Sequence, residues 1–328
     1  MKVLVASKGL ARRLSERRDL LPQDVEFVYP EHGTDEEMVA LAGDAEVIVS
    51  TRLSADVARA AKRLKLLQKT GAGVDAMPFE ALGEGVLVAN TSGSNPVPLA
   101  EGAVALVLAL AKKIVARHNA FPQGPSGGPG VELRGKKVGV LGLGSIGTEV
   151  ARRLKAFEME VLGIKRNPSE ELRAQLDLSY LGGPGDLHKF LSESDFVVVT
   201  VPLTPETRGL IGEEELRAMK PTSYLVNVAR AGIIQEEPLY RALTEDWIAG
   251  AALDVWWVPH WWDPIWVPDG RGASRYPFWE LPNVIATPHN IGSSDTRSDA
   301  SLMVMIENIR RVAEGRPPVN QVDRKLQY

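Results

Sequence analysis

The sequence contains no cysteine among its 328 residues. Disulfide bridges, thiolate metal sites and a cysteine nucleophile are therefore excluded, and we predict no metal site. Acidic and basic residues nearly balance, with 42 Asp and Glu against 38 Lys and Arg, so a concentrated basic charge is lacking as well. Because nucleic acids and membrane surfaces attract such charge, we expect neither a nucleic-acid partner nor membrane association.

Long apolar runs and a secretory leader are also missing. The longest apolar stretch, residues 102–111, has about half of the ~20 residues that a membrane-spanning helix needs. The N-terminal stretch is too short and carries Lys2 and Lys8 too early for a signal peptide. These absences predict a soluble, cytoplasmic protein, and a length of 328 residues predicts two domains of ordinary size.

Short β-rich segments alternate with amphipathic segments along the chain. Strands are predicted at residues 3–6, 25–29, 46–50, 66–70, 138–141, 161–164, 196–201, 224–228, 251–255 and 284–287. Intervening helices are predicted near residues 34–41 and 54–63, with one long helix over 98–117 and a linker over 121–130. Apolar strands separated by helices indicate an α/β protein with two parallel sheets, each covered on both faces.

The segment Gly142-Leu-Gly144-Ser-Ile-Gly147 has the G-x-G-x-x-G spacing of a dinucleotide-binding turn. It follows a predicted strand, residues 138–141, and precedes an amphipathic helical segment. The first glycine permits the tight turn, the second leaves room for a pyrophosphate, and the third lets helix and strand approach closely. The helix N-terminus then offers N–H groups to the phosphates. The alternative is a glycine-rich turn without a ligand.

Lys165 and Arg166 follow the next predicted strand, about 20 residues after the glycine turn. NAD-binding folds usually carry an acid at this place, which accepts hydrogen bonds from the ribose 2′-hydroxyl. Two cations would instead attract a 2′-phosphate. The sequence therefore favours NADP(H), with NAD(H) as the other possible cofactor. The alternative interpretation is that both charges are solvated beyond the strand.

The chain resembles the D-isomer-specific 2-hydroxyacid dehydrogenases over almost its whole length. The resemblance is carried by segments in the order of that family, namely 71–75 (GAGVD), 133–147, 201–212 (VPLTPETRGLIG), 219–221 (MKP), 226–232 (VNVARAG), 250–255 (GAALDV) and 283–289 (NVIATPH). It implies two Rossmann-like domains with parallel sheets and a cleft between them. The nucleotide-binding domain, residues 97–290, would be inserted into a substrate domain made of residues 1–96 and 291–328. Such enzymes are commonly homodimers.

Hydride transfer to a 2-oxoacid needs a cation that holds the carboxylate and an acid that protonates the developing alkoxide. The resemblance implies these roles for Arg230 and His289. A guanidinium can bind a carboxylate through parallel donors, and a histidine exchanges a proton near neutral pH. Ala72 and Gly73 match a turn whose backbone N–H groups meet the substrate carboxylate. The alternatives are a surface arginine, an ordinary loop histidine and a plain turn.

The resemblance also implies a set of dinucleotide-binding residues, which lie in the glycine turn and after the later strands. They are Gly142, Gly144, Ser145, Ile146, Gly147, Lys165, Arg166, Pro202, Thr207, Val228 and Asp254.

The match fails at the acid that should orient the histidine. Family members typically have Glu five residues after the position of Asp254, and here that residue is Pro259. Asp263, followed by Pro264, resembles the family's Glu-Pro pair displaced by a short insertion, so it is the candidate partner of the histidine. Formate dehydrogenases of the same superfamily have Gln there, so a carboxylate is not indispensable. Ala231 also departs from the family, which usually has Gly.

Five of the seven tryptophans of the chain lie within residues 256–266. They could line a substrate pocket, or they could pack at a dimer or domain interface. A Trp-rich pocket wall would suit a bulky or apolar 2-oxoacid better than glyoxylate alone.

The sequence thus predicts an oxidoreductase that transfers a hydride between NAD(P)H and a 2-oxoacid to give a D-2-hydroxyacid, similar to glyoxylate and hydroxypyruvate reductases. Phosphoglycerate, formate or phosphite oxidation is a sibling alternative. A cofactor-sensing binding protein, similar to the corepressors of the same fold, is the alternative from another class. The absence of the expected Glu favours it, whereas Arg230 and His289 speak against it.

Overall fold

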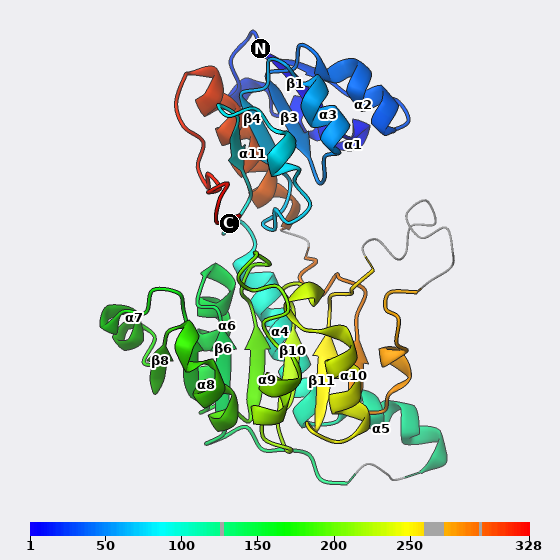
Figure 1. The fold of residues 1–328 in the computed structure, drawn as a ribbon, viewed down its shortest axis with the longest axis vertical. Helices are drawn as coiled ribbons and strands as arrows, with labels where there is room; N and C mark the ends of the chain where they lie inside the picture. Colours follow the sequence, from blue (N-terminus) through cyan, green and yellow to red (C-terminus); the bar gives the residue numbers. More distant parts are fainter. Residues whose placement is uncertain (125–127, 259–271, 295–296) are drawn as a thin grey trace. The chain divides into compact units, whose positions relative to one another are not determined.

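The structure is a computed structural model that describes residues 1–124, 128–258, 272–294 and 297–328 (Figure 1). These residues form two compact units. Unit 1 comprises Met1–Asn95 and Ser294–Tyr328, and unit 2 comprises Pro96–Ser293. Each unit contains one sheet of parallel strands, so the predicted α/β class with two parallel sheets is confirmed.

The sheet of unit 1 has five strands in the order β2-β1-β3-β4-β5, all parallel. The strands are β1 Lys2–Val5, β2 Glu26–Val28, β3 Val47–Ser50, β4 Leu66–Lys69 and β5 Leu87–Ala89. The helices are α1 Lys8–Ser15, α2 Asp35–Ala42, α3 Ala55–Ala60 and α11 Arg297–Ala313, with 3-10 turns η1 Arg18–Leu20 and η2 Phe79–Ala81. The direction of winding reverses between β1 and β3, which is the point where doubly wound folds bind ligands.

Local capping explains where the first helices of unit 1 begin. Ser7, Thr34 and Ser54 precede α1, α2 and α3, and each side-chain oxygen accepts a hydrogen bond from the backbone N–H three residues later. These bonds satisfy N–H groups that have no partner within the helix.

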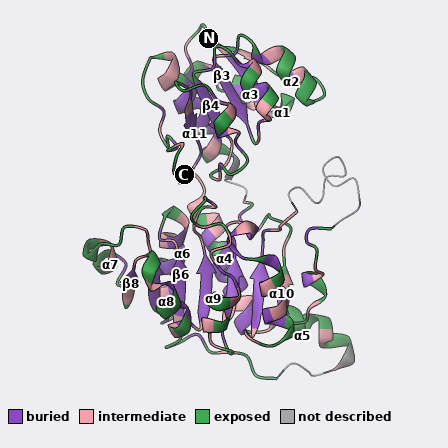
Figure 2. Ribbon diagram, in the orientation of Figure 1, coloured by how far each residue is buried: buried purple, intermediate pink, exposed green. Residues whose placement is uncertain are grey.

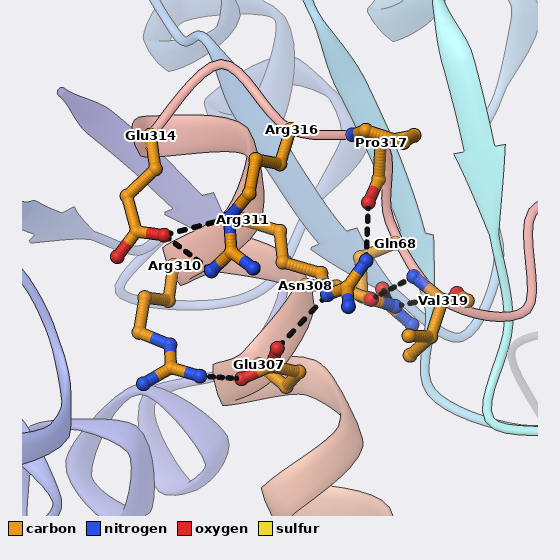
Figure 3. A network of polar contacts seen from close by, with 9 residues as sticks. All are labelled: Gln68, Glu307, Asn308, Arg310, Arg311, Glu314, Arg316, Pro317 and Val319. Carbon is orange, nitrogen blue, oxygen red and sulfur yellow. Dashed lines mark hydrogen bonds and ion pairs between the residues drawn. The ribbon is translucent and has the colours of Figure 1, made fainter.

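The C-terminal helix α11 is joined to β4 by a buried polar network (Figure 3). The Asn308 amide donates to the Gln68 side chain at 2.7 Å, and its oxygen accepts from the Val319 backbone N–H at 2.7 Å. The side chains of Asn308 and Gln68 are fully buried. Because a buried polar group without a partner is costly, these hydrogen bonds stabilise the unit. The last helix is therefore an integral part of unit 1, although it lies about 240 residues from β4 in sequence.

The sheet of unit 2 has seven parallel strands in the order β12-β11-β10-β9-β6-β7-β8 within the described residues. They are β6 Lys137–Leu141, β7 Glu160–Ile164, β8 Tyr180–Gly182, β9 Phe196–Val199, β10 Tyr224–Asn227, β11 Gly250–Leu253 and β12 Val284–Ala286. The helices are α4 Pro96–Ala111, α5 Ile114–Ala120, α6 Ser145–Lys155, α7 Glu170–Gln175, α8 Leu187–Glu193, α9 Glu213–Ala218 and α10 Glu236–Thr244. Short 3-10 turns are η3 Phe121–Gln123, η4 Pro184–Asp186, η5 Ala231–Ile233 and η6 Phe278–Glu280.

Both faces of this sheet are covered, as its continuous apolar strands predict (Figure 2). Val138 and Val140 of β6 belong to a core cluster with α4 and α6, whereas Leu141 belongs to a second cluster with Phe190 of α8. Successive strand residues point to opposite faces, so one strand contributes to both clusters.

The single long helix predicted over residues 98–117 is wrong. The structure has α4 and α5 instead, and Lys113 between them adopts a left-handed backbone with φ of 53°. A residue in this region cannot continue a right-handed helix. The three-residue strands β5 and β8 are not among the strands predicted from the sequence.

No helix in the described parts of the chain has the length and apolar character needed to cross a membrane.

Asp195 joins the amino ends of three strands of unit 2. Its carboxylate accepts hydrogen bonds from the Lys137 backbone N–H and from the Lys220 ammonium, both at 2.8 Å, and its carbonyl accepts from Tyr224 at the start of β10. Burial by itself would raise the pKa of Asp195, but the hydrogen bonds from Lys220 and Lys137 outweigh it and hold the pKa below its usual value.

Asp195→Asn is expected to lower the free energy of unfolding near pH 7 by about 1–3 kcal/mol, because the neutral amide loses two charge-assisted bonds. Since the folded-state pKa lies below the unfolded value of about 3.9, this stabilisation is present above that value and is lost as the pH falls through the folded-state pKa. Urea unfolding of both proteins from neutral to acidic pH measures it. A difference that persists unchanged in acid would contradict this assignment.

Candidate dinucleotide and acid–base site

The glycine turn after β6 has the shape that its spacing predicts. Gly142 has a φ of 103°, which favours glycine. A Cβ on Gly147 would lie 1.9 Å from the carbonyl oxygen of Gly142, so the third glycine allows α6 to begin directly against the turn. A Cβ on Gly144 would meet no atom within 4 Å. The space beside the second glycine is therefore open.

The start of α6 can hold an anion. Gly144 is its N-cap and offers no side chain, and the first helical hydrogen bond is donated by Thr148. The backbone N–H groups of Ser145, Ile146 and Gly147 consequently lack intrahelical acceptors and point toward the helix N-terminus. The open space at Gly144 together with these donors fits the pyrophosphate of a dinucleotide.

Lys165 and Arg166 lie at the carboxyl end of β7, beside this turn. The Lys165 ammonium donates to the carbonyl of Leu143, inside the glycine turn, at 2.8 Å. The Arg166 guanidinium forms an ion pair with Glu206 at 2.5 Å between Nη2 and Oε2. Lys165 is therefore tied to the glycine turn and Arg166 to the loop after β9, so each cation has a specific protein contact.

The loop after β9, which contains Pro202 and Thr207, adjoins the same turn. The Thr200 hydroxyl donates to the carbonyl of Gly142 at 2.6 Å. The Thr207 hydroxyl donates to the carbonyl of Pro202 at 2.6 Å and accepts from the Thr204 N–H at 2.8 Å. The Thr207 side chain thus closes the loop internally, which gives it a structural part besides the predicted contact with the cofactor.

Arg230 follows β10 and the buried Val228. The Asn227 side chain donates to the carbonyl of Arg230 at 3.0 Å and accepts from the N–H of Ala229 at 3.1 Å, which fixes the turn that carries the guanidinium. The following residue, Ala231, is 4% exposed, so the methyl group that distinguishes it from glycine is accommodated in the core.

His289 follows β12 in a loop held by Asp254. The Asp254 carboxylate accepts hydrogen bonds from the Thr287 hydroxyl at 2.7 Å and from the backbone N–H groups of Asn290 and Ile291 at 3.1 and 3.3 Å. Asp254 is 2% exposed, so these donors compensate a buried charge. Asp254 was predicted to bind the dinucleotide, and the structure gives its carboxylate oxygens these partners in the histidine loop.

Two of the clustered tryptophans lie within the described residues, and each forms one indole hydrogen bond inside unit 2. Trp256 donates to the carbonyl of Thr287, and Trp257 donates to the carbonyl of Ile234. Trp257 also stacks on Phe278. The candidate Asp263 lies outside the described residues, as do Trp261, Trp262 and Trp266.

Ala72 and Gly73 lie in unit 1, in the turn after the carboxyl end of β4. The Asn90 side chain donates to the carbonyl of Ala72 at 2.8 Å, and the Thr91 N–H donates to the carbonyl of Gly71 at 3.2 Å. The turn is thus attached to the end of β5, and its carbonyls are used in this attachment.

Among the cavities lined by described residues of unit 1, one lies at each end of its sheet. A polar cavity of about 170 Å³ lies at the carboxyl ends of β1 and β3, and Ser7, Thr51, Arg52 and Thr70 are among its lining residues. A larger cavity of about 790 Å³ lies at the amino ends of β4 and β5. Ligands of doubly wound sheets bind at carboxyl ends, so the smaller cavity has the functional position. Sequence reasoning missed these residues because they form no motif.

The residues predicted in unit 2 come together at one edge of its sheet. Gly142, Lys165, Pro202 and Arg230 follow β6, β7, β9 and β10, and His289 follows β12. Carboxyl ends of parallel strands share an edge, and the hydrogen bonds described above join neighbouring loops there. A Rossmann-type dinucleotide-binding fold with an arginine and a histidine at the ligand-binding edge defines the class of this protein.

Comparison with known proteins identifies the family. Residues 104–290 match the family described as "D-isomer specific 2-hydroxyacid dehydrogenase, NAD binding domain". The chain is 36% identical over 295 residues to glyoxylate reductase of Korarchaeum cryptofilum, which covers 86% of this chain and 84% of that protein. The chain belongs to the D-isomer-specific 2-hydroxyacid dehydrogenase family, as its motifs predict.

Two further matches extend the comparison. D-3-phosphoglycerate dehydrogenase of Methanocaldococcus jannaschii is 34% identical over 297 residues, which are 88% of this chain but 54% of that protein, so the chain spans about half the length of this relative. The structure of an NADPH-dependent glyoxylate/hydroxypyruvate reductase from Sinorhizobium meliloti, in complex with NADP and malonate, superposes with a TM-score of 0.81 at 26% identity, over 99% of this chain and 97% of that one.

Alanine at two of the glycines is expected to separate folding from dinucleotide binding. Gly147→Ala should lower the unfolding temperature, because the new methyl group meets a carbonyl oxygen of the turn. Gly144→Ala should leave this temperature nearly unchanged, since its φ is −86° and its surroundings are open, yet it should weaken dinucleotide binding at least about tenfold. Calorimetric unfolding and a dinucleotide titration measure both. Wild-type affinity in Gly144→Ala would contradict the assignment of the phosphate site.

Proposed function

We propose that this protein is an NADP(H)-preferring oxidoreductase that reduces a small 2-oxoacid to the D-2-hydroxyacid. One observation supports the proposal most directly. Arg230 and His289 follow strands whose carboxyl ends lie at the same sheet edge as the open glycine turn. Family membership supports it, as do the glyoxylate reductase and glyoxylate/hydroxypyruvate reductase among the similar proteins. Glyoxylate and hydroxypyruvate are therefore the substrates to test first.

Each residue of the proposed site has a separate role in the reaction. When a dinucleotide is bound at the glycine turn, its nicotinamide would supply the hydride. Arg230 binds the substrate carboxylate and polarises the neighbouring ketone through its parallel N–H donors. His289, in its protonated form, gives a proton to the oxygen as negative charge develops there. In unit 1, we assign a substrate-binding role to the backbone N–H groups of Ala72 and Gly73, and we accordingly infer that unit 1 is the substrate domain and unit 2 the dinucleotide-binding domain.

His289→Gln and Arg230→Lys are each expected to lower kcat/KM for glyoxylate or hydroxypyruvate by about 10²–10⁴-fold, since one removes the acid and the other removes the paired donors. NADPH oxidation followed by absorbance measures both. His188→Gln is the control, because His188 is an exposed histidine paired with Glu215 on α9 and should retain full activity. Unimpaired turnover in His289→Gln would exclude the proton-donor role.

The preference for NADP(H) is part of the proposal. Lys165 and Arg166 bring two positive charges to the end of β7, where an acid would select NAD(H). Glu206 pairs with Arg166, which offsets part of that charge, so the expected preference is for NADPH without exclusion of NADH.

Lys165→Asp is expected to raise KM for NADPH at least about tenfold and to change KM for NADH much less, because a carboxylate repels the 2′-phosphate but accepts a bond from a 2′-hydroxyl. Steady-state rates with both cofactors measure the ratio. Lys62→Asp is the matched control, since it makes the same charge change at the amino ends of the unit 1 strands. An unchanged KM for NADPH in Lys165→Asp would remove the basis for this preference.

We also propose that the protein is a cytoplasmic homodimer without a nucleic-acid partner. The exposed apolar side chains of Ile114 and Val115 on α5 and of Phe121, which follows α5 and is 82% exposed, support an interface on this helix. Exposed apolar groups gathered on one short segment are typical of protein–protein contacts.

A further inference from the structure

The loop that carries His289 is fixed at Thr287, two residues before the histidine. All three polar groups of Thr287 bind the last residue of β11 or the segment that follows it. Its N–H donates to the Leu253 carbonyl at 2.9 Å, its hydroxyl donates to Asp254 at 2.7 Å, and its carbonyl accepts from the Trp256 indole at 2.9 Å. Thr287 is thus held by three hydrogen bonds, one at each of its polar groups.

His289 itself has a left-handed backbone with φ of 56°. This conformation is unfavourable for a residue with a Cβ and persists only where the surroundings impose it. The ties at Thr287 on one side, and the Asp254 bonds to Asn290 and Ile291 on the other, impose it here. The direction of the imidazole therefore depends on these ties.

Trp256 provides the one tie among them that comes from an aromatic side chain. It is partly buried, and its ring packs edge-on against Trp279 with 6.1 Å between centroids. Its neighbour Trp257 makes the same kind of bond at the same 2.9 Å, but to Ile234, which follows β10 and η5 and does not belong to the histidine loop. Adjacent residues thus form two indole-to-carbonyl hydrogen bonds, and the bond from Trp256 is made to the loop that contains His289.

We propose that Trp256 is a positioning residue for His289. Its indole N–H holds the Thr287 carbonyl and thereby keeps the histidine backbone in the left-handed conformation that aims the imidazole at the substrate oxygen. The inference rests on the proposed function, because it presumes that His289 donates the proton. It assigns no chemical step to Trp256 itself.

Trp256→Phe and Trp257→Phe form a matched pair, since each keeps an aromatic ring and loses one indole donor to a backbone carbonyl. Trp256→Phe is expected to lower kcat about 3- to 10-fold, which corresponds to the loss of one hydrogen bond, and to shift the pKa in the pH profile of kcat/KM. KM for NADPH should be unchanged. The free energy of unfolding should fall by a similar amount in both variants. Trp257→Phe should nevertheless keep the wild-type kcat and the wild-type pH profile.

Thr287→Val provides a second variant with a nearly unchanged shape. It removes the hydroxyl bond to Asp254 and should lower kcat in the same direction as Trp256→Phe. Amide hydrogen exchange over residues 287–291 gives a readout that does not require activity, and it should accelerate in Trp256→Phe but not in Trp257→Phe.

Unchanged exchange and unchanged kcat in Trp256→Phe would overturn the inference, as would equal losses of kcat in the two tryptophan variants. Turnover by the wild type in the same assay separates this result from a failure of the proposed function. If the wild type reduces no 2-oxoacid, the function fails, and the exchange measurement still decides whether Trp256 holds the loop.

Discussion

The parallel direction of every strand in unit 2 is the constraint on which the proposed site depends. It brings the carboxyl ends of seven strands to one edge, so loops that are far apart in sequence become neighbours, such as those of Gly142 and Thr200, 58 residues apart. Side-chain and ion-pair contacts then join these loops, from Thr200 to the glycine turn, from Arg166 to Glu206 and from Asp254 to the histidine loop. The edge is therefore a connected surface on which ligand groups can be placed precisely.

A buried carboxylate organises one end of that surface. Asp254 receives bonds from a hydroxyl and from two backbone N–H groups, which offset the cost of removing its charge from water. Because these donors lie on both sides of His289, the hydrogen bonds to Asp254 also restrict the backbone of the loop around the histidine. Trp256 adds a further tie through the Thr287 carbonyl. The histidine is thus held in an unfavourable backbone conformation by contacts that are individually modest, which is typical of functional loops.

At the other end of this edge, near the glycine turn, the charged side chains after β7 are the main feature. The glycine turn offers backbone donors that suit any dinucleotide, whereas the proposed role of the cations after β7 concerns the ribose alone. Lys165 is drawn toward the turn by the Leu143 carbonyl, and Arg166 is shared with Glu206. The positive charge of Arg166 is therefore partly offset by Glu206, and the proposed preference for NADP(H) depends on the difference between these opposing charges.

The spacing of residues along the chain was sufficient to predict the parallel sheets, the glycine turn and the family, because these follow from local periodicity and from contiguous motifs. It was insufficient for the break at Lys113, for the link between Asp254 and His289, and for the separate acceptors of Trp256 and Trp257. The break at Lys113 depends on the left-handed backbone of that one residue. The link to the histidine loop and the two tryptophan acceptors depend on the order β12-β11-β10, which sets segments more than twenty residues apart side by side. Strand order results from packing of the whole domain, and no local pattern records it.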